Sequence, residues 1–156
     1  MTVGEPILRP AARVLLVDAR DRVLLFRGGD PARPGEPAYW FTVGGGLDPG
    51  ETPVEAAVRE TREETGLCRT ASDLVGPVWH EVVEFGFDGR TYRQSQDFFL
   101  SRVDHWEVDT SAFDELEVRS IDRHRWWSAD ELDATDDVCY PQGLADLLRR
   151  VLGRAG

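Results

Sequence analysis

One short stretch of the chain carries signals for both ends of a helix, and it constrains the fold more than any other feature. Thr52 is suited to cap a helix N-terminus, Pro53 suits the first helical position, and Glu55 completes a capping box. Gly66 is the residue type best able to adopt the left-handed conformation at a helix C-terminus. We therefore predict a helix that begins after Thr52 and ends at about Thr65.

Apolar runs elsewhere in the chain predict strands, over residues 13–17, 22–26, 39–43, 78–85, 90–103 and 125–127. The first two runs are separated by four polar or small residues, a pattern typical of an antiparallel hairpin. The third run ends in Gly44-Gly45-Gly46, which we interpret as a sharp, permissive loop.

Two more helices are expected near the C-terminus. Ser128 and Glu131 form a second capping-box pattern that opens a short helix, and Pro141 to Leu152 has apolar residues at helical spacing. Strands that interleave with three helices predict a mixed α/β domain. The 156 residues fit a single domain, taken as residues 1–156.

Three acids share one face of the first helix. At 100° per residue Glu60, Glu63 and Glu64 lie on one arc, while the other arc carries apolar residues and threonines. Such a face is usually solvated surface, but acids at this spacing repel one another and sit in the half of the helix where the dipole favours cations. Clustered carboxylate oxygens suit Mg²⁺ or Mn²⁺ rather than zinc. The pattern favours a site for a divalent metal.

The spacing of these acids resembles a known motif. Gly45, Glu51 and the run Arg59 to Leu67, whose sequence is RETREETGL, are similar to the complete Nudix box of the MutT-like Nudix hydrolases. Thr61 departs from it, because the family usually has an aliphatic residue there. Thr keeps a methyl group and the β-branch, so the departure concerns packing rather than chemistry.

The resemblance implies a Nudix-type α/β/α sandwich with a mixed β-sheet. It also implies that Mg²⁺, or Mn²⁺, is bound by Glu60, Glu63, Glu64 and the carbonyl of Gly45. Glu51 and Arg59 match family positions that orient this cluster by pairing, and Glu63, Glu64, Arg59 and Glu51 are the expected catalytic group. Many members add an acid from a late loop, for which the candidates are Glu115 and Glu117, although a solvated turn is the simpler interpretation of that segment.

The implied activity is metal-dependent hydrolysis of a pyrophosphate bond in a nucleoside diphosphate linked to another moiety, such as a nucleotide sugar or a nucleoside triphosphate. The residues do not select one substrate. A Nudix-fold ligand sensor without turnover is the alternative. An isopentenyl-diphosphate isomerase is weaker, because that enzyme uses a cysteine upstream of the box and none precedes Cys68.

Composition limits the partners. The net charge is −11, which disfavours binding of polymeric nucleic acid, and all 18 basic residues are arginine. A phosphate must therefore be held by arginine, backbone or metal, with Arg27, Arg90 and Arg93 as candidates. Aromatic residues near the predicted 78–103 hairpin are candidates to wall a base or sugar pocket, namely Trp79, Phe85 and Tyr92.

The remaining features predict the setting of the protein. The longest aliphatic runs are too short to span a bilayer, and residues 1–6 lack a secretory signal pattern. Cys68 and Cys139 lack the density of a disulfide scaffold and are expected to be reduced thiols. We expect a cytoplasmic protein that acts on a small nucleotide-type substrate and does not bind membranes, and the resemblance is compatible with a homodimer.

Overall fold

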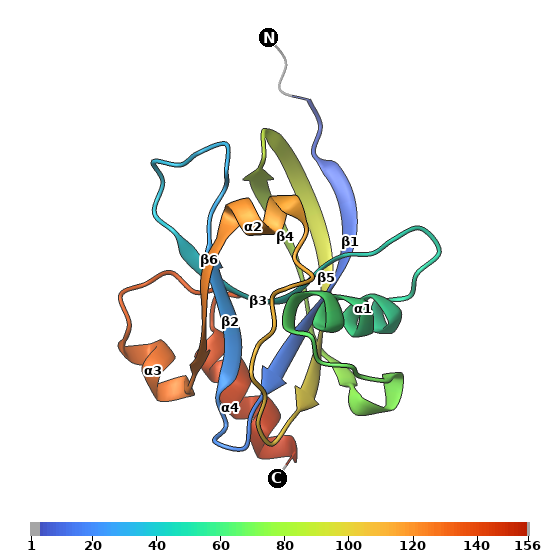
Figure 1. Ribbon diagram of the computed structural model, residues 1–156, viewed down its shortest axis with the longest axis vertical. Coiled ribbons are helices and arrows are strands. Elements are labelled where there is room, and N and C mark those ends of the chain that lie inside the picture. Colours follow the sequence, from blue (N-terminus) through green and yellow to red (C-terminus); the bar gives the residue numbers. More distant parts are fainter. Residues whose placement is uncertain (1–3, 156) are drawn as a thin grey trace.

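A six-stranded mixed sheet forms the centre of the computed structural model, which describes residues 4–155 (Figure 1). Its order is β4-β5-β1-β3-β2-β6. The bounds of the strands are β1 (Ile7–Val17), β2 (Val23–Gly28), β3 (Tyr39–Gly46), β4 (Val75–Phe87), β5 (Arg90–Arg102) and β6 (Ile121–Trp127). β1 and β5 are parallel and the other neighbouring pairs are antiparallel, so the sheet is mixed as expected.

The predicted antiparallel hairpin of the first two runs is confirmed at its turn, but its pairing does not extend along the strands. β1 and β2 are antiparallel and joined by a tight turn, but only Val17 and Val23 pair directly. Beyond that point β3 lies between them and pairs with both. A turn signal is local, whereas the partner of a strand depends on which apolar segments fill the sheet. The sequence of the turn therefore could not exclude an inserted strand.

The glycine run is strand rather than loop. Gly44, Gly45 and Gly46 continue β3 and pair with residues 11–13 of β1. The turn follows the glycines, where Gly50 has a positive φ of 78°. Glycine is required at position 44 because its φ is 135° and an added Cβ would meet the carbonyl oxygen of Ala12.

Helices cover both faces of the sheet (Figure 1). α1 (Pro53–Thr65) packs on one face against an apolar cluster that includes Val14, Leu24, Val43 and Phe99. α4 (Leu144–Ala155) packs on the other face against Leu15, Leu25, Phe98 and Trp127, and α3 (Ala129–Ala134) lies beside it. This layering confirms the predicted α/β sandwich.

The predicted ends of the main helix are confirmed. The Thr52 hydroxyl accepts a hydrogen bond from the Glu55 amide, and the Glu55 carboxylate accepts one from the Thr52 amide. At the other end, Gly66 has a φ of 77°. The later elements differ more. β6 begins four residues before the predicted residue 125, and α4 begins at Leu144 rather than Pro141, after Gly143 at a φ of 77°. Within residues 4–155, no helix is long and apolar enough to cross a membrane.

One helix was not predicted. α2 (Glu115–Ser120) begins after Asp114, whose side chain accepts from the Glu117 amide while Glu117 completes a capping box. The sequence contains this capping pattern, but six residues give no measurable helical period. A short 3₁₀ turn, η1 (Ala71–Asp73), links α1 to β4.

Candidate active site

Three glutamates from two helices meet beside the glycine end of β3. Glu60 and Glu64 come from the C-terminal half of α1, and Glu117 comes from α2. One carboxylate oxygen of each lies within 4.8 Å of the others. Glu64 is only 2% exposed and the other two are half-buried. Residues far apart in the chain thus form one group of oxygen donors.

Burial dominates the electrostatics of this group. It raises the pKa of Glu60 and of Glu117, and it raises the pKa of Glu64 well above its ordinary value. Neighbouring negative charges act in the same direction, while the Gly44 amide donates to Glu64 Oε1 at 2.7 Å and favours the charged form. The three carboxylates are therefore held close together against their own repulsion.

Arg59 links the cluster to the loop that precedes α1. Its guanidinium lies 2.8 Å from Glu51, 3.0 Å from Glu60 and 3.2 Å from Glu63, and it donates to the Gly46 carbonyl oxygen at 3.1 Å. The Arg59 contact holds the pKa of Glu51 at about 2. Glu63 is turned toward Arg59 and is not one of the three closest acids.

The backbone of β3 runs directly against these acids. A Cβ added at Gly45 would lie 2.8 Å from Glu60 Oε1, so any larger residue would push the carboxylate away. Glycine at this position brings backbone polar atoms beside the acidic group. Gly45 lines the same cavity as Glu60, Glu63 and Glu64.

The acidic group forms one wall of a cavity of about 1060 Å³. Other walls carry arginines and aromatic rings, including Arg9, Arg13, Arg90, Tyr39, Phe41, Phe85, Tyr92 and Tyr140. Phe85 and Tyr92 are stacked, with ring centroids 5.6 Å apart. A cavity of this size that combines cationic, acidic and aromatic groups is suited to a charged ligand with a ring.

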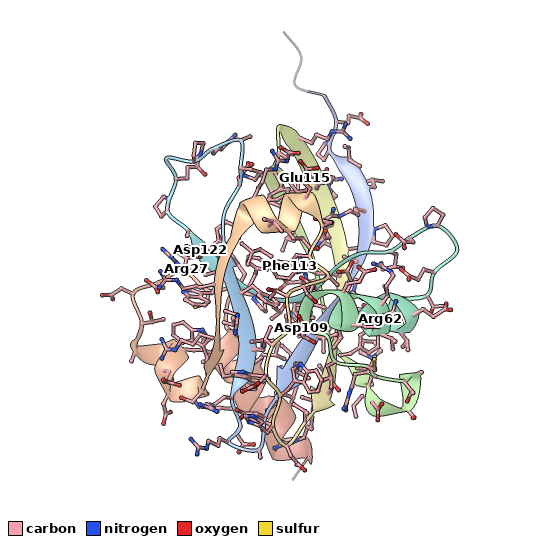
Figure 2. All side chains as sticks on the ribbon, viewed as in Figure 1. Arg27, Arg62, Asp109, Phe113, Glu115 and Asp122 are labelled. Atoms are coloured by element: carbon pink, nitrogen blue, oxygen red, sulfur yellow. The ribbon has the colours of Figure 1, made fainter. Side chains whose placement is uncertain are left out.

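Only some of the residues predicted to contact the substrate line the cavity. Arg90, Phe85 and Tyr92 line the cavity. Arg27 pairs instead with Asp122 at 2.8 Å, and these two side chains lie near β6 in Figure 2. Arg93 pairs with Glu84 at 2.7 Å, and the ring of Trp79 lies 5.2 Å from the Arg150 guanidinium.

The two candidate loop acids also differ. Glu117 belongs to the group of three acids, whereas Glu115 is exposed at the start of α2 (Figure 2). Their spacing in the sequence could not show which of the two side chains faces the site, because that depends on α2, which the sequence analysis did not predict.

Sequence reasoning missed Arg9 and Arg13, which line the cavity from β1. Their signal was present in the sequence. Two arginines four residues apart, on a strand that is otherwise apolar or small, place two charges on one face of a sheet.

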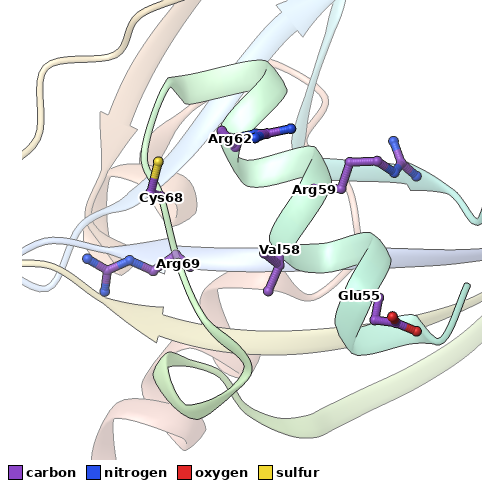
Figure 3. Close-up of a pocket in the computed structure, with 6 residues that line it drawn as sticks. All are labelled: Glu55, Val58, Arg59, Arg62, Cys68 and Arg69. Carbon is purple, nitrogen blue, oxygen red and sulfur yellow. The ribbon is translucent and has the colours of Figure 1, made fainter.

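A second, smaller pocket of about 450 Å³ lies between α1 and the segment after it (Figure 3). Its lining consists of Glu55, Val58, Arg59, Arg62, Cys68 and Arg69. This lining contains one carboxylate, Glu55, so the smaller pocket does not bring several carboxylates together. The group of oxygen donors is therefore a feature of the larger cavity.

The donors of the larger cavity fit a hard divalent cation. Three carboxylates within 4.8 Å of one another, beside a glycine backbone, are the ligand type that Mg²⁺ and Mn²⁺ prefer. Zinc sites use histidine or cysteine, and neither type occurs in this group.

Comparison with known proteins agrees with this geometry. A model of the NUDIX domain matches residues 7–147. RNA pyrophosphohydrolase from Agrobacterium fabrum is 33% identical over 105 residues, which are 62% of this chain and 62% of that protein. The protein of the same name from Erythrobacter litoralis is 37% identical over 78 residues, which are 45% of this chain and 48% of that protein. The chain thus matches about half to two thirds of these relatives.

Solved structures show the same fold. A MutT protein from Methanosarcina mazei superposes with a TM-score of 0.64 at 19% identity, covering 98% of this chain and 99% of that one. The dihydroneopterin triphosphate pyrophosphohydrolase of E. coli gives a TM-score of 0.67 at 16% identity, covering 95% and 99%. At these identities the likeness concerns the fold alone.

Proposed function

Because this chain belongs to the NUDIX domain family, we propose that it hydrolyses a phosphoanhydride bond in a nucleoside diphosphate linked to another moiety. The observation that carries the proposal is the meeting of Glu60, Glu64 and Glu117 at the wall of a cavity that also holds arginines and stacked aromatic rings. Family membership and site geometry support the same chemistry.

A divalent metal ion is part of this proposal. Glu60, Glu64 and Glu117 would hold it, with the Gly45 carbonyl as a backbone donor and Glu63 at the margin of the site. When bound, such an ion neutralises phosphate oxygens and makes water a better nucleophile. We propose Mg²⁺, with Mn²⁺ as a substitute, because the donors are hard oxygens.

The residues around the acids have separate tasks in this scheme. The Gly44 amide fixes one oxygen of Glu64 at 2.7 Å and leaves the second oxygen for binding. Arg59 orients Glu60 and keeps Glu51 ionised, so it acts as a positioning residue. Glu63 lines the cavity with a carboxylate that is 40% exposed and held by Arg59 at 3.2 Å, so it is accessible to a ligand at the margin of the metal site.

A panel of substrates tests the proposal. Nucleotide sugars, dinucleotides and nucleoside triphosphates are incubated with the protein and Mg²⁺, and released phosphate, pyrophosphate and nucleotide are quantified. We expect turnover of at least one compound, loss of turnover in EDTA, and recovery with Mg²⁺ or Mn²⁺. Binding of a nucleotide without any turnover would instead support the ligand-sensing alternative.

Both relatives described above are named RNA pyrophosphohydrolase, so the 5′-triphosphate end of RNA is a second candidate substrate. The charge of this chain argues against it. The net charge is −11, and the cavity walls include Glu81, Glu84 and Asp88, which would repel the phosphates of a polymer. Release of pyrophosphate from a 5′-triphosphorylated oligonucleotide should therefore be slower than cleavage of the best mononucleotide-type substrate. Faster cleavage of the oligonucleotide would reverse this ranking.

A further inference from the structure

Two arginines of β1 bring positive charge into the cavity without a carboxylate partner. Arg9 donates through Nε to Gln94 Oε1 at 2.7 Å, and Arg13 donates through Nη1 to the carbonyl oxygens of Thr42 and Gly44 at 3.1 and 3.0 Å. Within the described part of the chain neither forms an ion pair, although the sequence contains 29 acids.

An unpaired cation in a partly buried position is costly. Burial lowers the pKa of both arginines, while the charges of Glu64 on Arg13 and of Glu60 on both act in the opposite direction and only partly offset it. Arginine nevertheless stays protonated at neutral pH, so the charge persists. A bound anion would offset the cost, because Glu60 and Glu64 act on these arginines without forming an ion pair with them.

The two arginines differ in what remains free for a ligand. Arg13 is committed to the backbone of β3 and steadies the carbonyl groups beside the Gly44 amide. Arg9 uses only Nε for its hydrogen bond to Gln94. The described residues provide no hydrogen-bond acceptor for its two terminal nitrogens. Arg9 is therefore the one with hydrogen-bond donors to spare.

The plane of the Arg9 guanidinium is held in place. Its central carbon lies 4.7 Å from the centroid of the Tyr92 ring and 5.9 Å from that of Phe85, while Gln94 holds Nε from the neighbouring strand. Gln94 is fully buried and is held in turn by a 2.7 Å hydrogen bond to Gln96. A cation fixed in this way loses little conformational freedom when it binds an anion.

Arg9 also lies close to the acidic group. A Cβ added at Gly45 would lie 2.8 Å from a Glu60 oxygen, and one added at Gly46 would lie 3.0 Å from Arg9 Cδ. Consecutive strand residues face opposite sides of the sheet, so Glu60 and Arg9 approach β3 from its two faces, and both line the same cavity. A ligand with two linked phosphate groups in this cavity would contact both, with one phosphate at the acids and metal and the next at the arginine.

We propose that Arg9 is a specificity-determining residue that donates two parallel hydrogen bonds to a phosphate of the substrate, adjacent to the phosphate held at Glu60 and Glu64. The inference rests on the function proposed above. It makes Tyr92 and Gln94 positioning residues for Arg9. Compounds with a single phosphate should bind weakly.

Calorimetric titration with methylenediphosphonate in Mg²⁺ tests the inference directly, because this probe carries two linked phosphorus groups, has no base and resists hydrolysis. Arg9→Gln should weaken binding about tenfold or more, and Arg9→Lys should fall between it and the wild type. Arg20→Gln is the matched control, since it removes the same charge from an exposed turn residue. Melting temperatures of all variants check that each is folded.

Steady-state kinetics on the best substrate supplies the second readout. Arg9→Gln should lower kcat/KM about tenfold or more, because Arg9 binds a phosphate next to the bond that is cleaved. Equal affinity of Arg9→Gln and the wild type for methylenediphosphonate would overturn the inference, as would failure of the wild type to bind it. If Arg9→Gln loses binding while the wild type hydrolyses no compound, the anion site stands and the proposed hydrolysis fails.

Discussion

α1 and α4 lie on opposite faces of the same sheet, yet they are built differently. α4 buries Leu144, Leu147, Leu148 and Val151, an entirely aliphatic face. α1 buries small residues and threonines, Ala56, Ala57, Thr61 and Thr65, together with the carboxylate of Glu64. A buried carboxylate costs folding free energy that a leucine would not. The difference shows that α4 serves packing, whereas α1 gives up stability at the position where it carries the acids.

Both helices also carry an arginine that contacts several acids. Arg149 of α4 pairs with Asp130, Asp133 and Asp146, all more than half exposed. Arg59 of α1 pairs with Glu51 and Glu60, each 13% exposed. Exposed ion pairs contribute little to stability, while partly buried ones are screened less by water. Arg149 therefore forms surface ion pairs on α4, whereas Arg59 positions acids of the candidate site on α1.

The largest effect in this comparison should come from Glu64→Gln. We expect kcat to fall by about 10³-fold, because the variant removes an anionic ligand from the proposed metal site. Stability should not fall, since glutamine still accepts the Gly44 amide and removes a buried charge. Kinetics in Mg²⁺ and melting in EDTA measure the two effects. A variant with wild-type kcat would contradict the role given to α1.

Leu148→Ala in α4 should give the opposite result. Leu148 is fully buried, so its truncation should lower the unfolding free energy by about 3 kcal/mol. The kcat of the folded variant should stay near that of the wild type, because α4 is on the other face of the sheet from α1. Urea unfolding and kinetics well below the melting temperature test this. A loss of kcat without loss of stability would show that α4 contributes to the site.

Glu117→Gln and Glu115→Gln form a matched pair within α2. If Glu117 completes the site, its variant should lose about 10² in kcat. Glu115→Gln should be fully active, because that side chain is exposed and outside the group of three acids. Equal activities of the two variants would remove α2 from the proposed mechanism.

The smallest effect concerns the pH dependence of stability near Arg59. The Arg59 contact lowers the pKa of Glu51 from 4.5 to about 2, so the ion pair stabilises the fold above about pH 4.5 and this stabilisation disappears as the pH falls toward 2. Glu51→Gln should lower the unfolding free energy by about 1–2 kcal/mol at pH 6 and by almost nothing at pH 2.

The control on the α4 side is Asp130→Asn, which removes a carboxylate that is 96% exposed. Urea unfolding at pH 6 and pH 2, in EDTA, should show little difference between this variant and the wild type at either pH. A Glu51→Gln effect that does not change with pH would mean that the Arg59 contact is not its cause.

The sequence by itself determined the elements whose signals are local. The capping box at Thr52, the stop at Gly66 and the acidic face of α1 depend on residues within a few turns of one another, so they could be predicted without knowing the fold. The resemblance to the Nudix box rests on the same stretch, and the match over residues 7–147 confirms the family. The pairing of Glu51 with Arg59 was expected from that box and is present.

Only the tertiary structure decided which distant residues meet. In the folded chain β3 lies between β1 and β2, and the glycine run is part of that strand. Glu117 lies beside Glu60 and Glu64, and Arg9 and Arg13 line the cavity. These outcomes depend on which apolar faces are buried together, a property of the whole chain rather than of any segment. Glu115 and Glu117 are two residues apart in the sequence, but on a helix their side chains point in different directions. Only Glu117 belongs to the group of three acids.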